Sequence, residues 1–203
     1  MQKINYQREL DKLIAALDKT PQLLLHACCA PCSSYVLEYL SQHFEITVLY
    51  YNPNISPEEE FRKRAEELRR LISEMEFKNP VELIVDEYDH NEFLKAVKGL
   101  EAAPEGGERC FVCYRLRLER AAKYAAEHGF DCFCSTLSIS PLKNAQKLNE
   151  IGAELSQIYS VSSLPNDFKK KGGYLRSIEL SREYDLYRQN YCGCTFSKSQ
   201  NST

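Results

Sequence analysis

The chain has 203 residues, of which 43% are hydrophobic, and this is enough to build one domain around a single buried core. Its formal charge of −3 argues against a protein that coats nucleic acid through overall charge, although a local basic patch could still face a chosen RNA. A polar start and the lack of any apolar run near the roughly 18 residues of a membrane span predict a cytoplasmic protein that makes no membrane contact.

Short apolar runs alternate with amphipathic stretches, the order that is typical of a mostly parallel sheet covered by helices on both faces. We expect strands at residues 22–27, 46–51, 81–85, 131–137 and 157–161. We expect helices at residues 33–41, 57–75, 91–98, 111–128, 144–157 and 178–187. This order predicts one α/β domain over residues 1–203, with an exposed loop at 164–173 and a disordered tail at 197–203.

Nine cysteines, far more than a chain of this length usually carries, fall into four close groups. The groups are Cys28, Cys29 and Cys32, then Cys110 and Cys113, then Cys132 and Cys134, and finally Cys192 and Cys194. Secreted disulfide scaffolds are usually below about 100 residues and rich in loops, so this grouping favours metal or redox chemistry.

Two of these groups are positioned as ligands of one metal centre. Cys28 and Cys29 follow the first expected strand, at the sheet edge where α/β proteins bind ligands. Cys110 and Cys113 form a C-x-x-C turn at the start of a helix, which lets two sulfurs bind one centre. Four thiolates suit zinc as well as a 4Fe-4S cluster, and we prefer the cluster because adjacent cysteines are unusual in zinc ribbons. The alternative is that the vicinal pair packs as small hydrophobic residues.

Cys192 and Cys194 flank one glycine, so a disulfide between them would close a small ring that is strained and easily reduced. Such a pair suits a switch or an electron relay, and the alternatives are two additional metal ligands or two free thiols. Cys32 lies one short turn beyond the vicinal pair and is a candidate ligand for a second metal, a reactive thiol or a packing residue.

The remaining cysteines and one histidine are interpreted as core residues. Cys132 and Cys134 alternate with Phe133 in an expected strand, so the two thiols should share one face and mainly pack there. His26 lies in an apolar strand, where a lone histidine is more often a hydrogen-bonded core residue than a metal ligand. We therefore leave these side chains off the ligand set.

Four blocks of sequence resemble the QueH-type epoxyqueuosine reductases. They are HACCAPC at 26–32, RCFVCYRLR at 109–117, TLSISP at 136–141 and YRQNYCGC at 187–194. Their order and flanking residues also match. The resemblance implies a Rossmann-like fold of the adenine-nucleotide-hydrolase (HUP) type, with three α/β/α layers. It implies an oxidoreductase of tRNA processing that reduces epoxyqueuosine to queuosine at the wobble nucleotide, the last step of queuosine biosynthesis.

The resemblance also implies roles for single residues. The ligands of a 4Fe-4S cluster would be Cys28, Cys29, Cys110 and Cys113, and Cys192 and Cys194 would be a redox-active pair that can form a disulfide bond. Some relatives carry aspartate where this chain has Cys32, a candidate ligand for an additional mononuclear iron, so the chain departs from the pattern there. The electron donor would be a ferredoxin, a flavodoxin or a thiol.

A tRNA substrate requires cations near its phosphates, and the reaction requires a proton donor. The candidate phosphate contacts are Lys143, Lys147, Lys169, Lys170, Lys171, Arg176 and Arg188. The alternative is that these side chains form an ordinary solvated surface. Tyr114, Asp131 or a cysteine thiol could supply the proton.

Two rival functions share part of this pattern. An adenylyl-sulfate reductase also combines a vicinal cysteine pair with a distant C-x-x-C. The first expected strand, however, runs into CCAPC rather than the glycine-rich loop of a nucleotide site. The second rival is a non-catalytic zinc module that binds RNA, in which the thiolates only hold the fold together. Iron content separates the zinc module from both enzymes.

Overall fold

The computed structural model describes residues 4–200 of the chain. At its centre lies a five-stranded sheet in the order β3-β2-β1-β4-β5, and every neighbouring pair is parallel. The strands are β1 (Gln22–His26), β2 (Glu45–Tyr50), β3 (Val81–Val85), β4 (Cys132–Ser135) and β5 (Ser162–Ser163). The parallel sheet confirms the predicted fold class.

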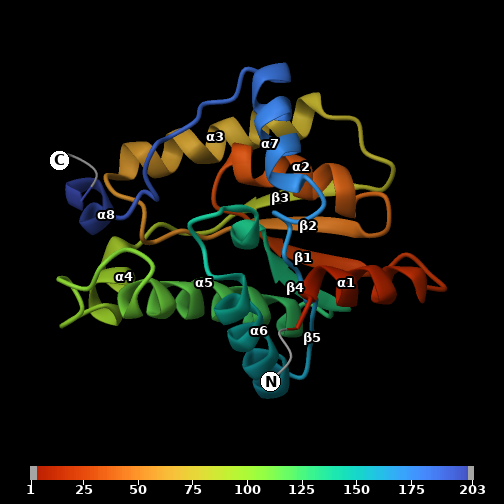
Figure 1. Cartoon of the computed structure of the whole chain (residues 1–203), viewed down its shortest axis with the longest axis horizontal. Coiled ribbons are helices and arrows are strands. Elements are labelled where there is room, and N and C mark those ends of the chain that lie inside the picture. The colour runs from red at the N-terminus through yellow and green to blue at the C-terminus, as the bar shows by residue number, and fades with distance from the viewer. Residues whose placement is uncertain (1–3, 201–203) are drawn as a thin grey trace.

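Helices cover both faces of this sheet, as Figure 1 shows. One layer contains α2 (Ala30–Leu40), α3 (Glu58–Glu74) and α7 (Gly173–Glu183), and the other contains α5 (Glu108–Glu127) and α6 (Ala145–Tyr159). The remaining helices are α1 (Tyr6–Ala15), α4 (His90–Ala96), the 3-10 helix η1 (Thr136–Ile139) and α8 (Thr195–Gln200). The three layers therefore follow the α/β/α order that the resemblance implied.

Alternating strand side chains divide the core between the two faces. Leu25 packs with the hydrophobic residues of α2 and α3, whereas Leu24 packs with those of α5 and α6. In β4, Cys132 and Cys134 join the first cluster and Phe133 joins the second. This confirms that the two thiols share one face and pack in the core.

Both ends of the described chain form helices that were not predicted. The first helix, α1, has a charged, polar sequence in which Leu10 is the fully buried apolar residue, so its pattern is weak. At the other end, residues 197–200 of the expected disordered tail belong to α8. Residues 201–203 of that tail lie outside the described residues.

The fifth strand and α7 are also displaced from their predicted positions. Strand β5 lies at Ser162–Ser163 and not at 157–161, and α7 covers Gly173–Glu183 and not 178–187. Helix α6 continues to Tyr159 and stops at Ser160, whose φ of 53° is left-handed, so β5 comes later than the predicted strand at 157–161. The segment 164–173, expected to be an exposed loop, is buried around Asn166 and exposed at Lys170. Asn166 is held because its backbone N–H donates to Asn149 Oδ1 at 2.9 Å.

The strand order locates the edge at which a ligand site is expected. From β1 the chain passes to β2 and β3 on one side and then returns to β4 on the other side of β1. A crevice opens outside the carboxyl ends of the strands at such a reversal, and parallel sheets bind ligands there. Cys28 follows β1 and Thr136 follows β4, and their Sγ and Oγ1 atoms lie 3.9 Å apart.

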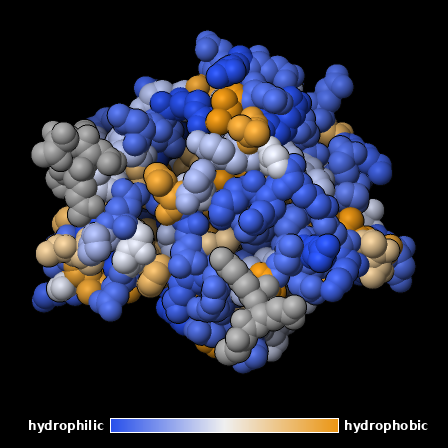
Figure 2. Space-filling model, viewed as in Figure 1, coloured by the Kyte–Doolittle hydropathy of each residue, from blue (hydrophilic) through white to orange (hydrophobic). Residues whose placement is uncertain are grey.

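The face of the molecule drawn in Figure 2 is largely hydrophilic, and hydrophobic residues form small, separate patches on it. Among residues 4–200, no helix combines the length and the apolar character needed to cross a membrane.

Gly173 fixes the start of α7 against α2. A Cβ atom there would collide with the Phe168 carbonyl oxygen and the Tyr35 ring, so Gly173→Ala should lower the free energy of unfolding by about 3 kcal/mol, as overpacking of a core does. Urea denaturation followed by circular dichroism measures this loss. The control is Gly152→Ala, which meets only the side chain of Ser163 and should cost clearly less because a hydroxyl can rotate away. Equal losses would contradict this account.

Candidate metal centre and cavity

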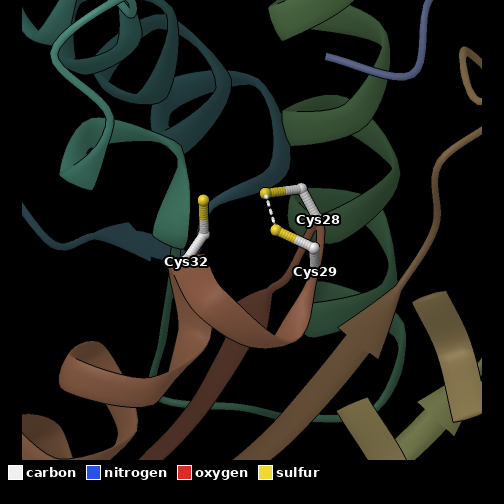
Figure 3. Close-up of side chains that lie close together, drawn as sticks. All are labelled: Cys28, Cys29 and Cys32. Atoms are coloured by element: carbon white, nitrogen blue, oxygen red, sulfur yellow. Dashed lines mark hydrogen bonds between the residues drawn. The ribbon is translucent and has the colours of Figure 1, made fainter. Parts of the chain in front are cut away.

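The vicinal thiols lie in the turn between β1 and α2. Cys29 is the N-cap residue of α2, and Cys32 lies in the first turn of that helix. The Cys28 and Cys29 sulfurs are 3.8 Å apart, and those of Cys28, Cys29 and Cys32 all lie within 4.8 Å of one another. Figure 3 shows the three thiols on the same side of the turn. This close group could hold a metal ion, and it contains Cys32, which the predicted cluster ligands do not include.

The three thiols are electrostatically unequal. Hydrogen bonds with Cys28 and Cys32, together with the nearby positive charge of Arg64, lower the pKa of Cys29 well below its ordinary value. The hydrogen bond with Cys29 raises the pKa of Cys28 to about 11. Hydrogen bonds with Cys28 and Cys29 raise the pKa of Cys32. Because metals bind thiolates, the lowered pKa of Cys29 favours it as a metal ligand.

The second cysteine pair lies on the first turns of α5. The backbone N–H of Gly106 donates to Cys110 Sγ at 3.2 Å, as backbone N–H groups commonly do for thiolate ligands. Cys113 is buried beside Phe93 and Cys194, and burial raises its pKa to about 11. Cys110 and Cys113 lie outside the close group of three. Cys110 is half-buried and Cys113 is buried.

A tight turn carries the third pair. The backbone N–H of Ser56 donates to the Gly193 carbonyl at 3.0 Å, and Arg64 Nη1 donates to the Cys192 carbonyl at 3.2 Å. Gly193 has a φ of 98°, and a Cβ there would come within 2.9 Å of Ile55, so the turn requires glycine. Cys192 and Cys194 are free thiols in this structure.

Two neighbouring cavities connect these cysteine groups. The larger, of about 360 Å³, is lined by the close group of three and by Cys192, with walls from η1, α7 and residues 188–192. The smaller, of about 10 Å³, is lined by Cys110, Cys113 and Cys194. Four side chains line both cavities, namely Glu105, Arg117, Lys143 and Cys192. Cysteines from three distant segments therefore converge on one edge of the sheet.

Buried arginines provide the positive charge that an anionic metal–thiolate centre needs. Arg64 and Arg117 are 2% and 1% exposed, and Nη2 of each has no hydrogen-bond partner. Burial opposes the charge of Arg117, but Cys113, Cys192 and Cys28 raise its pKa above the ordinary value. The thiol set and these buried donors thus fit an iron-sulfur cluster. Arg117 follows Cys113 by one helical turn, and this spacing could have identified it in the sequence as a residue of the site. No sequence pattern indicates that Arg64 belongs to the site.

The candidate phosphate-binding residues are dispersed. Lys143 is buried, with a side chain that is only 8% exposed, and it lines the cavity. Arg188 also lines the cavity and donates to Ser181 Oγ at 2.9 Å. The other five lie further out, and four of these form ion pairs, Lys147 with Glu150, Lys169 with Asp167, Lys171 with Asp11 and Arg176 with Glu38. Lys170 is exposed.

His26 and Asp131 have structural partners. His26 is fully buried, and its Nδ1 and Nε2 lie 2.9 Å from Ser135 Oγ and 3.0 Å from the Tyr51 carbonyl, as expected of a core histidine. Asp131 precedes β4 and accepts from the backbone N–H of Gln22 at 2.9 Å. This places Asp131 at the amino edge of the sheet, away from the thiols, so it is not positioned to donate a proton there.

Comparisons with known proteins identify related chains. The model of the family "Epoxyqueuosine reductase QueH" matches residues 23–200. The QueH of Streptococcus pyogenes serotype M1 is 46% identical over 96% of this chain and 78% of its own length. The QueH of Staphylococcus epidermidis is 46% identical over 96% of this chain and 85% of its own length. The QueH of Thermotoga maritima is 35% identical over 86% of this chain and 89% of its own length. All three relatives are epoxyqueuosine reductases.

Proposed function

The chain belongs to the epoxyqueuosine reductase QueH family, and from this premise we propose that it reduces epoxyqueuosine to queuosine in tRNA with a bound iron-sulfur cluster. The reaction takes up two electrons and two protons, breaks both C–O bonds of the epoxide, and leaves a double bond and water. The observation that carries the proposal is the convergence of cysteines from distant segments beside one cavity. The family match over residues 23–200 favours this reaction over that of an adenylyl-sulfate reductase.

We propose that the 4Fe-4S cluster is bound by Cys28, Cys29, Cys110 and Cys113. Cys28 and Cys29 line the larger cavity and Cys110 and Cys113 line the smaller one. Arg117 lines both cavities and interacts with Cys113 and Cys28, so it would balance the negative charge of the thiolates. When bound, such a cluster supplies single electrons. Cys32 belongs to the close group of three thiols, which supports its role as a candidate ligand of an additional mononuclear iron.

Cys192 and Cys194 are the proposed redox-active pair that exchanges electrons with a ferredoxin, a flavodoxin or a thiol. Their positions differ in a way that suits this role. Cys192 opens into the larger cavity and accepts a hydrogen bond from Lys143 Nζ at 3.3 Å, whereas burial raises the pKa of Cys194. An accessible thiol beside a cation is the more reactive member of such a pair.

The tRNA is proposed to insert its wobble nucleotide into the larger cavity, because enzymes that modify a base extrude it into a pocket. Lys143 and Arg188 both line this cavity. Lys143 is buried, so we do not retain it as a phosphate contact, whereas Arg188 is exposed and can reach the tRNA backbone. Phosphates further away would be contacted by Lys147, Lys169, Lys170, Lys171 and Arg176.

Arg188→Gln should therefore weaken tRNA binding at every salt concentration, and it should reduce the slope of log affinity against log salt by about one unit. Filter binding across a salt series measures both quantities. Arg62→Gln, which removes a 73% exposed arginine of α3, is the matched control and should leave the slope unchanged. Equal slopes for the two variants would remove Arg188 from the interface.

The direct test is anaerobic incubation of the iron-reconstituted protein with dithionite and tRNA that carries epoxyqueuosine. Nucleoside mass analysis should show conversion to queuosine, and the loaded protein should show the broad visible absorption of an iron-sulfur centre. A fully loaded protein that leaves epoxyqueuosine intact would refute the proposed function. A protein that binds zinc and excludes iron would instead support the RNA-binding zinc module.

A further inference from the structure

Lys143 is the only lysine among the described side chains that line the larger cavity. It follows η1, where its backbone N–H donates to the Ser140 carbonyl at 3.1 Å. Its Nζ atom lies 3.3 Å from Cys192 Sγ and 3.5 Å from Glu105 Oε1. A buried ammonium with two partners on neighbouring segments is held in one place, as a group that acts on a bound substrate must be.

The surroundings of Lys143 keep its side chain protonated. Burial opposes the positive charge, but Cys192 and Tyr114 together raise the pKa of Lys143 above its ordinary value. The ammonium therefore carries a proton at neutral pH inside the cavity. The three arginines that line the cavity, Arg64, Arg117 and Arg188, are also charged, but a guanidinium does not release its proton in proteins.

Resting on the proposed function, we propose that Lys143 is the catalytic proton donor, whose ammonium protonates the epoxide oxygen as the first C–O bond breaks. The oxygen that leaves carbon would otherwise be an alkoxide, which is a much stronger base than an amine. Proton transfer from an ammonium to such an oxygen is therefore favourable even where the ammonium is stabilised.

The other candidate donors are less well placed. Asp131 lies at the opposite edge of the sheet, where it binds Gln22 and Lys19. Tyr114 is 1% exposed and lines only the smaller cavity, and burial raises its pKa to about 12. Lys143 lines the larger cavity, which has room for a nucleotide base, and its ion-pair partner Glu105 lines the same cavity.

Two electrons come from an external one-electron donor, which is dithionite in the assay, and the epoxide carbons are reduced to an alkene. Lys143 supplies one of the two protons to the oxygen and water supplies the other, so that the oxygen leaves as water. Solvent then reprotonates the neutral amine beside Glu105, and the residue returns to its starting state.

The test measures single-turnover conversion of epoxyqueuosine-containing tRNA by iron-loaded Lys143→Ala and Lys143→Gln proteins. Both should react about 10²–10⁴-fold more slowly than wild type, the usual contribution of a general acid. Iron content and tRNA affinity should stay at the wild-type level in both. Added ethylammonium should restore rate to Lys143→Ala, which leaves space for the amine, but not to Lys143→Gln. The matched control is Lys12→Ala, on a 71% exposed lysine of α1, which should react at the wild-type rate.

Each other outcome overturns the assignment. Rates close to wild type in both variants would show that the proton comes from elsewhere. A slow Lys143→Ala protein that keeps its iron and tRNA affinity but gains nothing from ethylammonium would also refute it. Loss of iron from both variants would assign Lys143 a structural role. An inactive wild-type protein would refute the proposed function itself, so the two failures are distinguishable.

Discussion

Cys29→Ala is expected to reduce iron binding to background and to abolish the conversion of epoxyqueuosine. Cys29 lies closest to thiolate form among the three grouped thiols, and it is the one that the charge of Arg64 stabilises. Its loss removes a proposed cluster ligand and leaves the buried Arg64 without this negative partner, which is costly in a protein interior. Iron analysis and visible absorption after anaerobic reconstitution measure the effect.

The matched control makes the same substitution at Cys132. Cys132 is also buried, and it packs in the core cluster that lies against α2 and α3. Its sulfur has a weak contact with the Gln22 carbonyl, at 3.9 Å. Cys132→Ala should lose about 1 kcal/mol of stability through the missing sulfur and retain full iron binding and activity. Iron content in Cys29→Ala equal to that of Cys132→Ala would eliminate Cys29 as a ligand.

Much of the fold could be predicted because the strands are buried, short apolar runs. Val81–Val85 has the predicted bounds, β1 is one residue shorter than predicted at its C-terminal end, and β2 and α3 differ from prediction by one residue at each end. Two elements with weak hydrophobic patterns, α1 and β5, were not predicted correctly. In α1 charged residues outnumber buried ones, and β5 consists of only two serines, which carry no hydrophobic signal. Its place in the sheet is set by pairing with Cys132 and Phe133, a contact between distant segments that no local pattern encodes.

The site was predictable to the extent that its chemistry is carried by cysteines. The C-x-x-C spacing and the vicinal pair could be recognised locally, and the parallel topology placed both at one edge. Arg64 could not be predicted, because a charged residue on an amphipathic helix is normally exposed and only the approach of residues 192–193 buries it. Lys143 could not be predicted as a buried residue either, because its contact with Cys192 joins two segments that are distant in the sequence.

Cys192→Ala and Cys194→Ala proteins are each expected to keep their iron and to lose turnover driven by a thiol donor. A redox-active pair cycles between a dithiol and a disulfide, so the loss of either sulfur stops the cycle. Dithionite can reduce the metal centre directly, and it should therefore still support one turnover in both variants. Turnover with a dithiol donor, compared with single turnover under dithionite, measures the difference.

The Cys192→Ala and Cys194→Ala variants also test whether these two cysteines are a redox-active pair or two additional metal ligands. Cys113 and Cys194 share a small hydrophobic cluster with Phe93, so Cys194 is near a proposed ligand. If Cys194 bound iron, Cys194→Ala would lose iron and would react with neither donor. Cys192 is half-buried and accepts a hydrogen bond from Lys143, whereas Cys194 is buried. Iodoacetamide should therefore modify Cys192 before Cys194 in the metal-free protein. Peptide mass analysis that found the reverse order would contradict the proposed division of roles within the pair.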